Sequence, residues 1–446
     1  MHGGRRKVLG MALLGVANPL LAALPAAAPG GAATLDRELE AIALDPRCEL
    51  ASLAVLAIRD GAVAYEYACG RRFIGTGGAG DPPDLPAGVD TLYRIASVSK
   101  MMTTLGLMRL VEEGRVDLDA DVSTALGFAL RNPHFPDRAI TLRHLLTHTS
   151  SLRDDAGYSW PAGTALRDVL LPDAAGMWSA QAGPGDYFTY CNLGWGVIGT
   201  LMERVSGERF DRLMRRLLLD PLGLQAGYDP AALAPAALAN LATLYRKRTV
   251  DTEVWDARGP WIAQADDYHL HPPAPPAGLE RHPIGVNATP FSPTGGLRIS
   301  ARGLGTVMRM LMQGGVHEGR RLLRADTLAR MFARQWTYDG SNGDTLDGLF
   351  HCWGLGNAQF PDRPEDRTRL VDGGGFAAVG HLGDAYGLQS MFLADLARRN
   401  GMIVLVGGTA SDPLAPPNQG RYSALARFQE RILTVLYRRA ILVQKA

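Results

Sequence analysis

Two apolar runs joined by a turn signal open the patterned part of the chain. Residues 50–58 are almost wholly apolar, and Asp60-Gly61 is a dipeptide typical of tight turns. The chain then returns over residues 62–68. This pattern predicts a β-hairpin. Residues 71–90 follow, rich in Gly, Pro and Asp, and are expected to form a loop.

A long apolar stretch begins at Ser97 and stops at Gly114. On a helix drawn through this stretch, apolar residues such as Met101, Leu105 and Leu107 occupy most sides. A helix that is apolar all round is a buried one. We therefore expect this helix to lie in the core.

Helical patterns dominate residues 120–275. Residues 140–146 predict a short helix, and residues 193–205 predict an amphipathic helix that ends at Gly207. Residues 210–219 predict another helix.

Strand patterns return near the C-terminal end of the chain. Residues 387–394 and 402–406 predict two strands, with a turn signal at Asn400-Gly401. Residues 425–436 carry apolar positions at helical spacing. Strands therefore begin and end the patterned chain, and helices lie between them.

This order predicts an α/β (α+β) protein. We expect an antiparallel sheet flanked by helices, built from both chain ends, with an inserted all-helical lobe. The α/β lobe is placed at about residues 34–120 and 285–446, and the helical lobe at about residues 121–284.

Charge is almost balanced over the 446 residues. Lys and Arg number 46, Asp and Glu number 45, and the net charge is +1. That balance argues against a nucleic-acid or membrane-surface partner recruited by bulk charge. A small-molecule or peptide substrate is the partner we expect, and the oligomeric state stays open.

The first 33 residues resemble an export signal. Arg5, Arg6 and Lys7 precede an apolar run over residues 8–24, and small residues suited to cleavage follow. The paired arginines also suit a twin-arginine signal. We expect an exported protein, periplasmic or extracellular, without a stable membrane span after cleavage. The alternatives are a first core helix or a membrane anchor.

The four cysteines are Cys48, Cys69, Cys191 and Cys352. Their spacing matches neither a metal site nor a dense disulfide framework. A turn at residues 60–61 would place Cys69 opposite Ser52 instead of Cys48, so we expect all four to be free and buried.

Ser97 and Lys100 are the first candidates for chemistry. Residues three apart on a helix share a face, so the lysine amine can lie beside the serine hydroxyl. Desolvation disfavours the ammonium, which lets such a lysine act as a base toward the serine. Ser99 is a second candidate nucleophile, but only Ser97 has a lysine three positions later.

Tyr190-Cys191-Asn192 stands just before the predicted amphipathic helix. A tyrosine beside a lysine ammonium can ionise below its usual pKa and serve as a general base. Asn192 could donate its amide to a substrate carbonyl or to the lysine. The competing interpretation is a helix-initiating loop with a packed tyrosine.

A third segment runs from Gly380 through His381 and Gly383 to Asp384. Glycines in a strand allow another backbone or a ligand to approach closely. Backbone N–H groups there could complete an oxyanion hole with the N–H of Ser97. His381 could bind a carboxylate or assist proton transfer, or it could be a surface histidine in a turn.

Together these segments resemble the serine β-lactamase and penicillin-binding protein family, in its class C-like branch with esterases and D-aminopeptidases. The resemblance covers roughly residues 45–440. It rests on these segments: Ser97-Val98-Ser99-Lys100, residues 140–150, Pro184-Gly185, Tyr190-Cys191-Asn192 and Thr294-Gly295-Gly296-Leu297.

The resemblance implies roles for the candidate residues. Ser97 would be the nucleophile, Lys100 and Tyr190 the proton-transfer pair, and Asn192 an orienting group. The N–H groups of Ser97 and Asp384, beyond Gly383, would form the oxyanion hole. We expect no metal and no cofactor.

His381 departs from the family pattern, because β-lactamases and transpeptidases carry a lysine at this position. A histidine is mostly neutral at pH 7, with an ordinary pKa of about 6.5. We expect weaker binding of substrate carboxylates above pH 7 and a partial imitation of lysine below pH 6. Ester or amide substrates, as for an esterase or a D-amino-acid peptidase, are therefore favoured over β-lactams.

Other functions stay open. A true β-lactamase, a D,D-carboxypeptidase or an acyltransferase would use the same residues, and an inactive member would act in binding or regulation. Residues 266–271 offer Asp and His side chains to a metal, but they lie in a Pro-rich region. No Gly-x-Ser-x-Gly segment predicts an ordinary catalytic triad.

Overall fold

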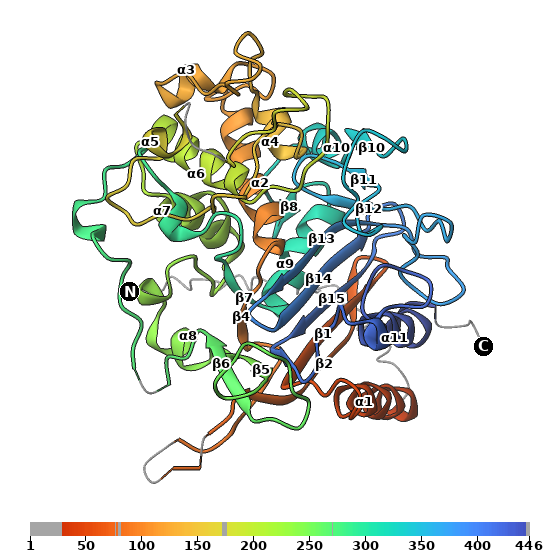
Figure 1. Ribbon diagram of the computed structural model, residues 1–446. Helices are drawn as coiled ribbons and strands as arrows, with labels where there is room; N and C mark the ends of the chain where they lie inside the picture. The colour runs from red at the N-terminus through yellow and green to blue at the C-terminus, as the bar shows by residue number, and fades with distance from the viewer. Residues whose placement is uncertain (1–28, 76, 79–81, 172–175, 270, 443–446) are drawn as a thin grey trace, which may run out of the picture.

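The computed structural model describes residues 29–75, 77–78, 82–171, 176–269 and 271–442. Most of the predicted export signal, residues 1–28, lies outside them. The main feature is a nine-stranded sheet in the order β10-β11-β12-β13-β14-β15-β1-β2-β3 (Figure 1). Its strands are β1 Ser52–Arg59, β2 Ala62–Phe73, β3 Leu85–Pro86, β10 Trp336–Thr337, β11 Cys352–Trp353, β12 Ala358–Phe360, β13 Ala378–Ala385, β14 Leu388–Asp395 and β15 Asn400–Val406.

Strands from the two ends of the chain meet inside this sheet, where β1 pairs with β15. Leu53 lies opposite Val406, and Ile58 lies opposite Gly401. All neighbouring strands of the sheet are antiparallel. The predicted antiparallel sheet, built from both chain ends and flanked by helices, is confirmed.

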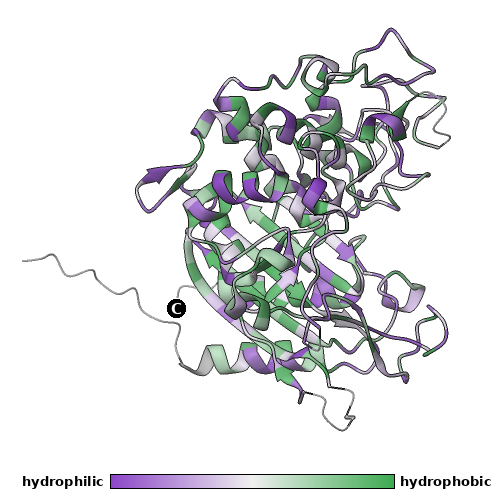
Figure 2. Ribbon diagram, turned by 90° about the vertical axis from the view of Figure 1, so that its left-hand side faces the viewer, coloured by the Kyte–Doolittle hydropathy of each residue, from purple (hydrophilic) through white to green (hydrophobic). Residues whose placement is uncertain are grey.

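Both faces of β1 are buried, which explains why its sequence is continuously apolar. Leu56 and its neighbours two residues away pack into one core, whereas Val55 and its neighbours pack into the other. Helices α1 (Pro29–Ala43) and α11 (Arg427–Leu436) cover one face of the sheet, as Figure 1 shows. Figure 2 shows apolar residues along the central strands.

The other face of the sheet carries α2 and α9, and most other helices gather at one end of the molecule (Figure 1). Their bounds are α2 Val98–Glu112, α3 Val122–Leu126, α4 Leu142–Leu146, α5 Leu166–Leu170, α6 Leu193–Ser206, α7 Phe210–Met214, α8 Pro235–Ala239, α9 Ala301–Met312 and α10 Ala325–Phe332. None of the helices in the described part of the chain is long and apolar enough to cross a membrane.

The inserted segment is not helical throughout. β5 (Leu244–Lys247) and β6 (Trp261–Ala265) form a small sheet with β16 (Gly408–Thr409). β16 follows β15 directly, so the inserted chain returns to an edge of the α/β part and extends it with strands. The remaining strands form two short pairs: β4 Leu92–Arg94 with β7 Arg298–Ser300, and β8 Val316–His317 with β9 Arg320–Arg321.

Two turns depart from the sequence-based expectations. A bulge between Ala57 and Ile58 shifts the register of the first hairpin, so Cys69 lies opposite Leu53 and not Ser52. At the C-terminal hairpin, Asn400 and Gly401 already belong to β15, and the turn precedes them. All four cysteines are free, and three are buried; Cys69 is only partly so.

Candidate active site

Ser97 occupies the first position before α2, the helix that the sequence predicted to be buried. The preceding residue, Ala96, has a φ of 45°, a left-handed conformation that is uncommon for a residue with a side chain. Such strain is tolerated where the surrounding structure enforces it, and it clusters at functional sites. It turns the chain from β4 into α2 within a few residues.

The Lys100 amine donates a hydrogen bond to Ser97 Oγ over 2.9 Å. It also donates to Asn192 Oδ1 at 2.7 Å and to the Thr294 carbonyl at 3.3 Å. Lys100 is completely buried. Burial lowers the pKa of Lys100 to about 7, against the opposing charge of Asp154. A large fraction of this amine is therefore neutral at neutral pH and able to accept a proton.

Ser99 serves a different purpose. It is completely buried, and its Oγ accepts a hydrogen bond from the Leu297 N–H at 3.1 Å. This bond ties α2 to the segment before β7. The geometry therefore favours Ser97, not Ser99, as the nucleophile.

Tyr190 lies beside both residues of the pair. The Lys100 Nζ is 4.8 Å from the centre of its ring, and its hydroxyl interacts with the Ser97 side chain. Burial nevertheless raises the pKa of Tyr190, and the negative charge of Asp154 adds to the rise. The expectation that Tyr190 ionises below its usual pKa is therefore wrong, because desolvation outweighs the hydrogen bond with Ser97, which lowers this pKa. Tyr190 keeps its proton and can donate it.

Both the oxygen and the nitrogen of the Asn192 side-chain amide form hydrogen bonds. Its Oδ1 accepts hydrogen bonds from Lys100 and from Thr294 Oγ1, the latter at 2.8 Å. Its Nδ2 donates to Asp154 at 2.8 Å. Of the two suggested roles, the structure shows contact with the lysine, although through the amide oxygen and not the nitrogen.

Asp154 is a site residue that the sequence did not reveal. Its carboxylate accepts the backbone N–H groups of Asn192 at 2.7 Å and Leu193 at 2.9 Å, at the start of α6. Helix N-termini favour such a negative charge. The capping residue comes from a distant loop, so no local capping signal precedes α6 in the sequence.

Gly383 brings β13 against the start of α2. A Cβ atom at this position would lie 2.6 Å from the Ile95 carbonyl oxygen and 3.1 Å from the Ser97 nitrogen. Only glycine permits this approach. It brings the Gly383 backbone beside the Ser97 nitrogen, and Asp384 is the next residue on β13. The oxyanion hole formed by the N–H groups of Ser97 and Asp384 stays a prediction.

The edge of β13 next to this site has no strand along most of its length. β12 pairs only with residues 378–380, whereas β14 follows the opposite edge as far as Ala385. In the described part of the chain, the edge beyond Gly380 is therefore left for another extended group, such as a substrate.

His381 lies on β13 and is completely buried, so it is not a surface histidine. Its Nδ1 hydrogen-bonds the Leu382 carbonyl at 2.6 Å. Burial and the charge of Lys100 lower the pKa of His381 to about 3. The expectation that His381 gains charge below pH 6 and imitates lysine is therefore wrong.

Aromatic rings enclose this end of the site. The His148 ring lies 4.4 Å from Tyr190, 4.9 Å from Trp195 and 4.8 Å from Trp353, measured between ring centres. His148 Nδ1 accepts the Cys191 N–H at 3.0 Å. His148 belongs to the 140–150 segment, which the sequence singled out without assigning it a role.

The suggested metal-binding segment has another role. Both carboxylate oxygens of Asp266 accept hydrogen bonds from Arg298, at 3.0 and 2.7 Å. Among the described residues, no three His, Cys, Asp or Glu side chains are grouped as a metal would require.

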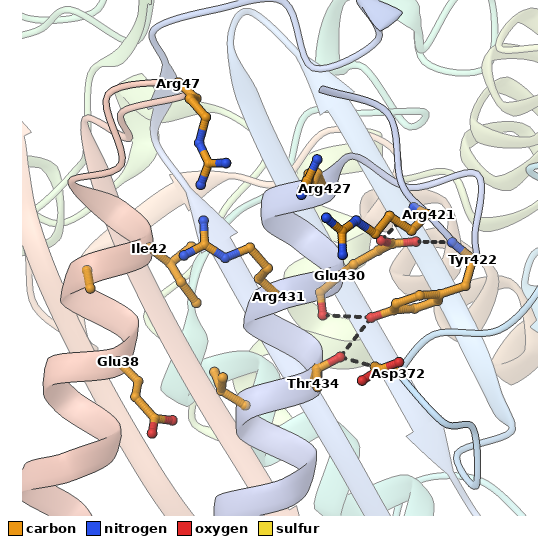
Figure 3. A pocket seen from close by; sticks show the side chains of 12 residues that line it. Glu38, Ile42, Arg47, Asp372, Arg421, Tyr422, Arg427, Glu430, Arg431 and Thr434 are labelled. Carbon is orange, nitrogen blue, oxygen red and sulfur yellow. Dashed lines mark hydrogen bonds between the residues drawn. The ribbon is translucent and has the colours of Figure 1, made fainter. Parts of the chain in front are cut away.

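A large hollow of the described molecule lies elsewhere. A cavity of about 600 Å³ lies between α1 and α11 and contains none of the residues around Ser97 (Figure 3). Its Glu430 carboxylate accepts the backbone N–H groups of Arg421, Tyr422 and Ser423 and so fixes the chain before α11. We assign this hollow no part in the chemistry.

The family model described as Beta-lactamase matches residues 34–425. The chain belongs to the beta-lactamase family. The resemblance inferred from the motifs is thereby confirmed.

Known members of the family give its range. The carboxypeptidase/endopeptidase AmpH of Escherichia coli K12 is 31% identical over 32% of this chain and 38% of its own length. Esterase EstB of Burkholderia gladioli is 32% identical over 44% of this chain and 51% of its own length. The chain thus spans between about a third and a half of these relatives.

Solved structures share the fold over more of the chain. The hydrolase EstCE1 matches 91% of this chain and 99% of its own, with a TM-score of 0.64 and 21% identity. The D-amino acid amidase of Ochrobactrum anthropi SV3 matches 84% of this chain and 91% of its own, with a TM-score of 0.58 and 19% identity. The esterase and the carboxypeptidase/endopeptidase among the relatives, together with the family match, support a hydrolase.

Proposed function

We propose that the protein is an exported serine hydrolase that cleaves ester or amide bonds through an acyl-enzyme on Ser97, as an esterase or a D-amino-acid peptidase. One observation carries this proposal: the buried Lys100 amine lies 2.9 Å from Ser97 Oγ, and its pKa is lowered to about 7. A neutral amine at that distance can take the serine proton.

Acylation follows from this geometry. Ser97 Oγ attacks the substrate carbonyl carbon while its proton passes to Lys100. The negative oxygen that forms is stabilised by the N–H groups of Ser97 and Asp384. The bond to the leaving group then breaks, and Tyr190 donates its proton to the departing oxygen or nitrogen. The Lys100 ammonium returns its proton to Tyr190.

Deacylation reverses these roles. A water molecule attacks the acyl carbonyl and gives its proton to the same pair, and Ser97 Oγ leaves as a hydroxyl. If another alcohol or amine replaces the water, the same steps transfer the acyl group. Asn192 keeps the Lys100 amine directed at Ser97 throughout, because its Oδ1 accepts from that amine.

The substrate class follows from His381. A β-lactamase or a D,D-carboxypeptidase must hold a carboxylate on the leaving-group side, and a neutral histidine offers no charge for it. The similarity to AmpH keeps the D,D-carboxypeptidase as the second candidate. We expect esters and D-amino-acid amides to be cleaved faster than peptides ending in D-Ala-D-Ala or cephalosporins.

A fluorophosphonate probe with peptide mapping tests this proposal. Labelling should map to Ser97 and be abolished by Ser97→Ala, whereas Ser99→Ala should retain most of it. A panel of p-nitrophenyl esters, D-amino-acid amides, a D-Ala-D-Ala peptide and a cephalosporin then ranks the substrates. Labelling that maps elsewhere, or a folded protein that neither reacts nor turns over any substrate, would reject the proposal.

A further inference from the structure

A positively charged side chain, Arg94, lies three residues before Ser97 and forms no salt bridge with any described residue. Arg94 ends β4, and its Nε donates a hydrogen bond to the Gly295 carbonyl at 3.1 Å. Its two terminal NH₂ groups have no hydrogen-bond partner among the described residues. The nearby Asp266 is already bound by Arg298 through both oxygens.

The Arg94 side chain shares a loop with the catalytic lysine. The Thr294 carbonyl accepts from Lys100, and the next carbonyl along the chain, that of Gly295, accepts from Arg94. A Cβ atom at Gly295 would lie 3.6 Å from the Ala96 carbonyl carbon, which bonds to the Ser97 nitrogen. The guanidinium is therefore held close to the start of α2.

Aromatic side chains flank this guanidinium. The Arg94 carbon Cζ lies 4.9 Å from the centre of the ring of Tyr386, which stands in the turn directly after β13, two residues beyond Asp384. Tyr386 is 41% exposed and Tyr158 is 44% exposed. Tyr158 also interacts electrostatically with Arg94: burial raises the pKa of Tyr158, and the positive charge of Arg94 opposes that rise. Burial and the like charge of Arg298 lower the pKa of Arg94 itself, and the charge of Asp266 only partly opposes them.

The position of Tyr190, the proposed proton donor, indicates in which direction a substrate would lie along β13. The Tyr190 ring lies 6.5 Å from the His381 ring, so the leaving group belongs at the His381 end of the β13 edge. With the scissile carbonyl between the Ser97 and Asp384 N–H groups, the acyl part then extends the other way. That direction leads to Tyr386 and Arg94.

We propose that Arg94, held beside Tyr386, binds an anionic group on the acyl part of the substrate, so that the enzyme prefers acyl groups bearing a carboxylate. This inference rests on the proposed function, because it assumes an acyl-enzyme on Ser97. A planar guanidinium whose two NH₂ groups have no hydrogen-bond partner among the described residues suits a carboxylate, which it can bind through two parallel hydrogen bonds.

Two p-nitrophenyl esters with acyl chains of equal length test the proposal. Mono-p-nitrophenyl adipate ends in a carboxylate, whereas p-nitrophenyl hexanoate ends in a methyl group. Arg94→Gln should lower kcat/KM for the adipate about tenfold to a hundredfold, the effect of one charge-assisted interaction. Its kcat/KM for the hexanoate should fall much less, so that the ratio of the two kcat/KM values changes by most of that factor. Arg94→Lys should recover part of the loss, because it restores the charge without the fork.

The possible outcomes distinguish a failure of the proposed function from a failure of the proposed role of Arg94. A wild type that hydrolyses neither ester and is not labelled at Ser97 by the fluorophosphonate contradicts the proposed function itself. A wild type that is labelled at Ser97 but hydrolyses neither ester rejects the preference for acyl groups bearing a carboxylate. A wild type that hydrolyses hexanoate, with an Arg94→Gln variant that loses both esters equally or neither, overturns the role of Arg94 alone. If Arg94→Gln does not fold, the wild type still decides: added salt should weaken its preference for the adipate, and a preference that salt does not change rejects the inference.

Discussion

At one end of the uncovered β13 edge stands His381, buried among Tyr190 and Trp353 and kept neutral by desolvation. At the other end, Arg94 lies against Tyr386, and among the described residues no carboxylate forms a salt bridge with it; Asp266, the nearby carboxylate, is bound by Arg298. Ser97 stands between them. In β-lactamases and transpeptidases a lysine at the His381 position supplies a positive charge. In this chain the nearby positive charge is that of Arg94, on the other side of Ser97, where we propose that it selects the acyl group and not the leaving group.

The largest loss of activity is expected when Lys100 or Tyr190, the proposed proton-transfer pair near His381, is substituted. Lys100→Ala and Tyr190→Phe should each lower kcat/KM by roughly two to four decades, the contribution of a general acid–base group. The double variant should be little worse than either single variant, because the two residues pass one proton between them. Steady-state kinetics with p-nitrophenyl hexanoate measure this. Losses that multiply in the double variant would show that the two residues act independently.

The second largest loss of activity is expected from a substitution at Gly383, near the middle of the β13 edge. Gly383→Ala places a Cβ atom 2.6 Å from the Ile95 carbonyl oxygen, so β13 must move away from Ser97. We expect kcat to fall by roughly two to three decades, as when an oxyanion-hole donor is lost.

Gly163→Ala is the matched control for this substitution, because its Cβ atom would meet nothing within 4 Å. Kinetics and thermal unfolding of both variants separate a local loss of activity from a loss of fold. Wild-type kcat in a folded Gly383→Ala protein would contradict the close approach of β13.

Asp154 should have a smaller effect with a distinctive pH dependence. Its charge raises the pKa of Lys100, so Asp154→Asn should lower that pKa further and move the rise in rate to lower pH. The lost charge-assisted hydrogen bonds should also cost about 1.5–3 kcal/mol of stability. The control is Asp155→Asn, whose carboxylate pairs only with the exposed Arg153 among the described residues. An unchanged pH profile in the Asp154 variant would rule out its electrostatic role.

The smallest expected effect lies at His381. Its pKa of about 3 keeps it neutral between about pH 5 and 8, the range in which an ordinary histidine titrates. The ratio of kcat/KM for a cephalosporin to that for p-nitrophenyl hexanoate should therefore stay nearly constant across this range. A ratio that rises steeply toward pH 5 would mean that His381 gains a proton and binds the cephalosporin carboxylate.

Much of the arrangement of side chains around Lys100 could be predicted from the sequence. The spacing of Ser97 and Lys100 fixes a shared helical face, and α2 forms as its apolar pattern indicates. Tyr190 and Asn192 stand directly before a helix with a clear amphipathic pattern, and both reach Lys100. These relations are local or depend on strong periodicity, which a sequence expresses directly.

The rest depends on contacts between distant segments. Asp154 caps α6 from a separate loop, and Arg94 meets Tyr386 across nearly three hundred residues of chain. The direction of the Tyr190 and His381 pKa shifts depends on how completely other segments enclose them. The bulge at Ala57 likewise reflects local backbone geometry that the turn signal does not reveal.

The most direct test of the account is the pH dependence of fluorophosphonate labelling at Ser97. If a buried, neutral Lys100 activates the serine, the second-order labelling rate should rise through an inflection near pH 7 and then level off. Lys100→Ala should remove that inflection and leave a slow residual rate. An inflection near the ordinary lysine value of about 10.4, or one that survives in Lys100→Ala, would contradict the account.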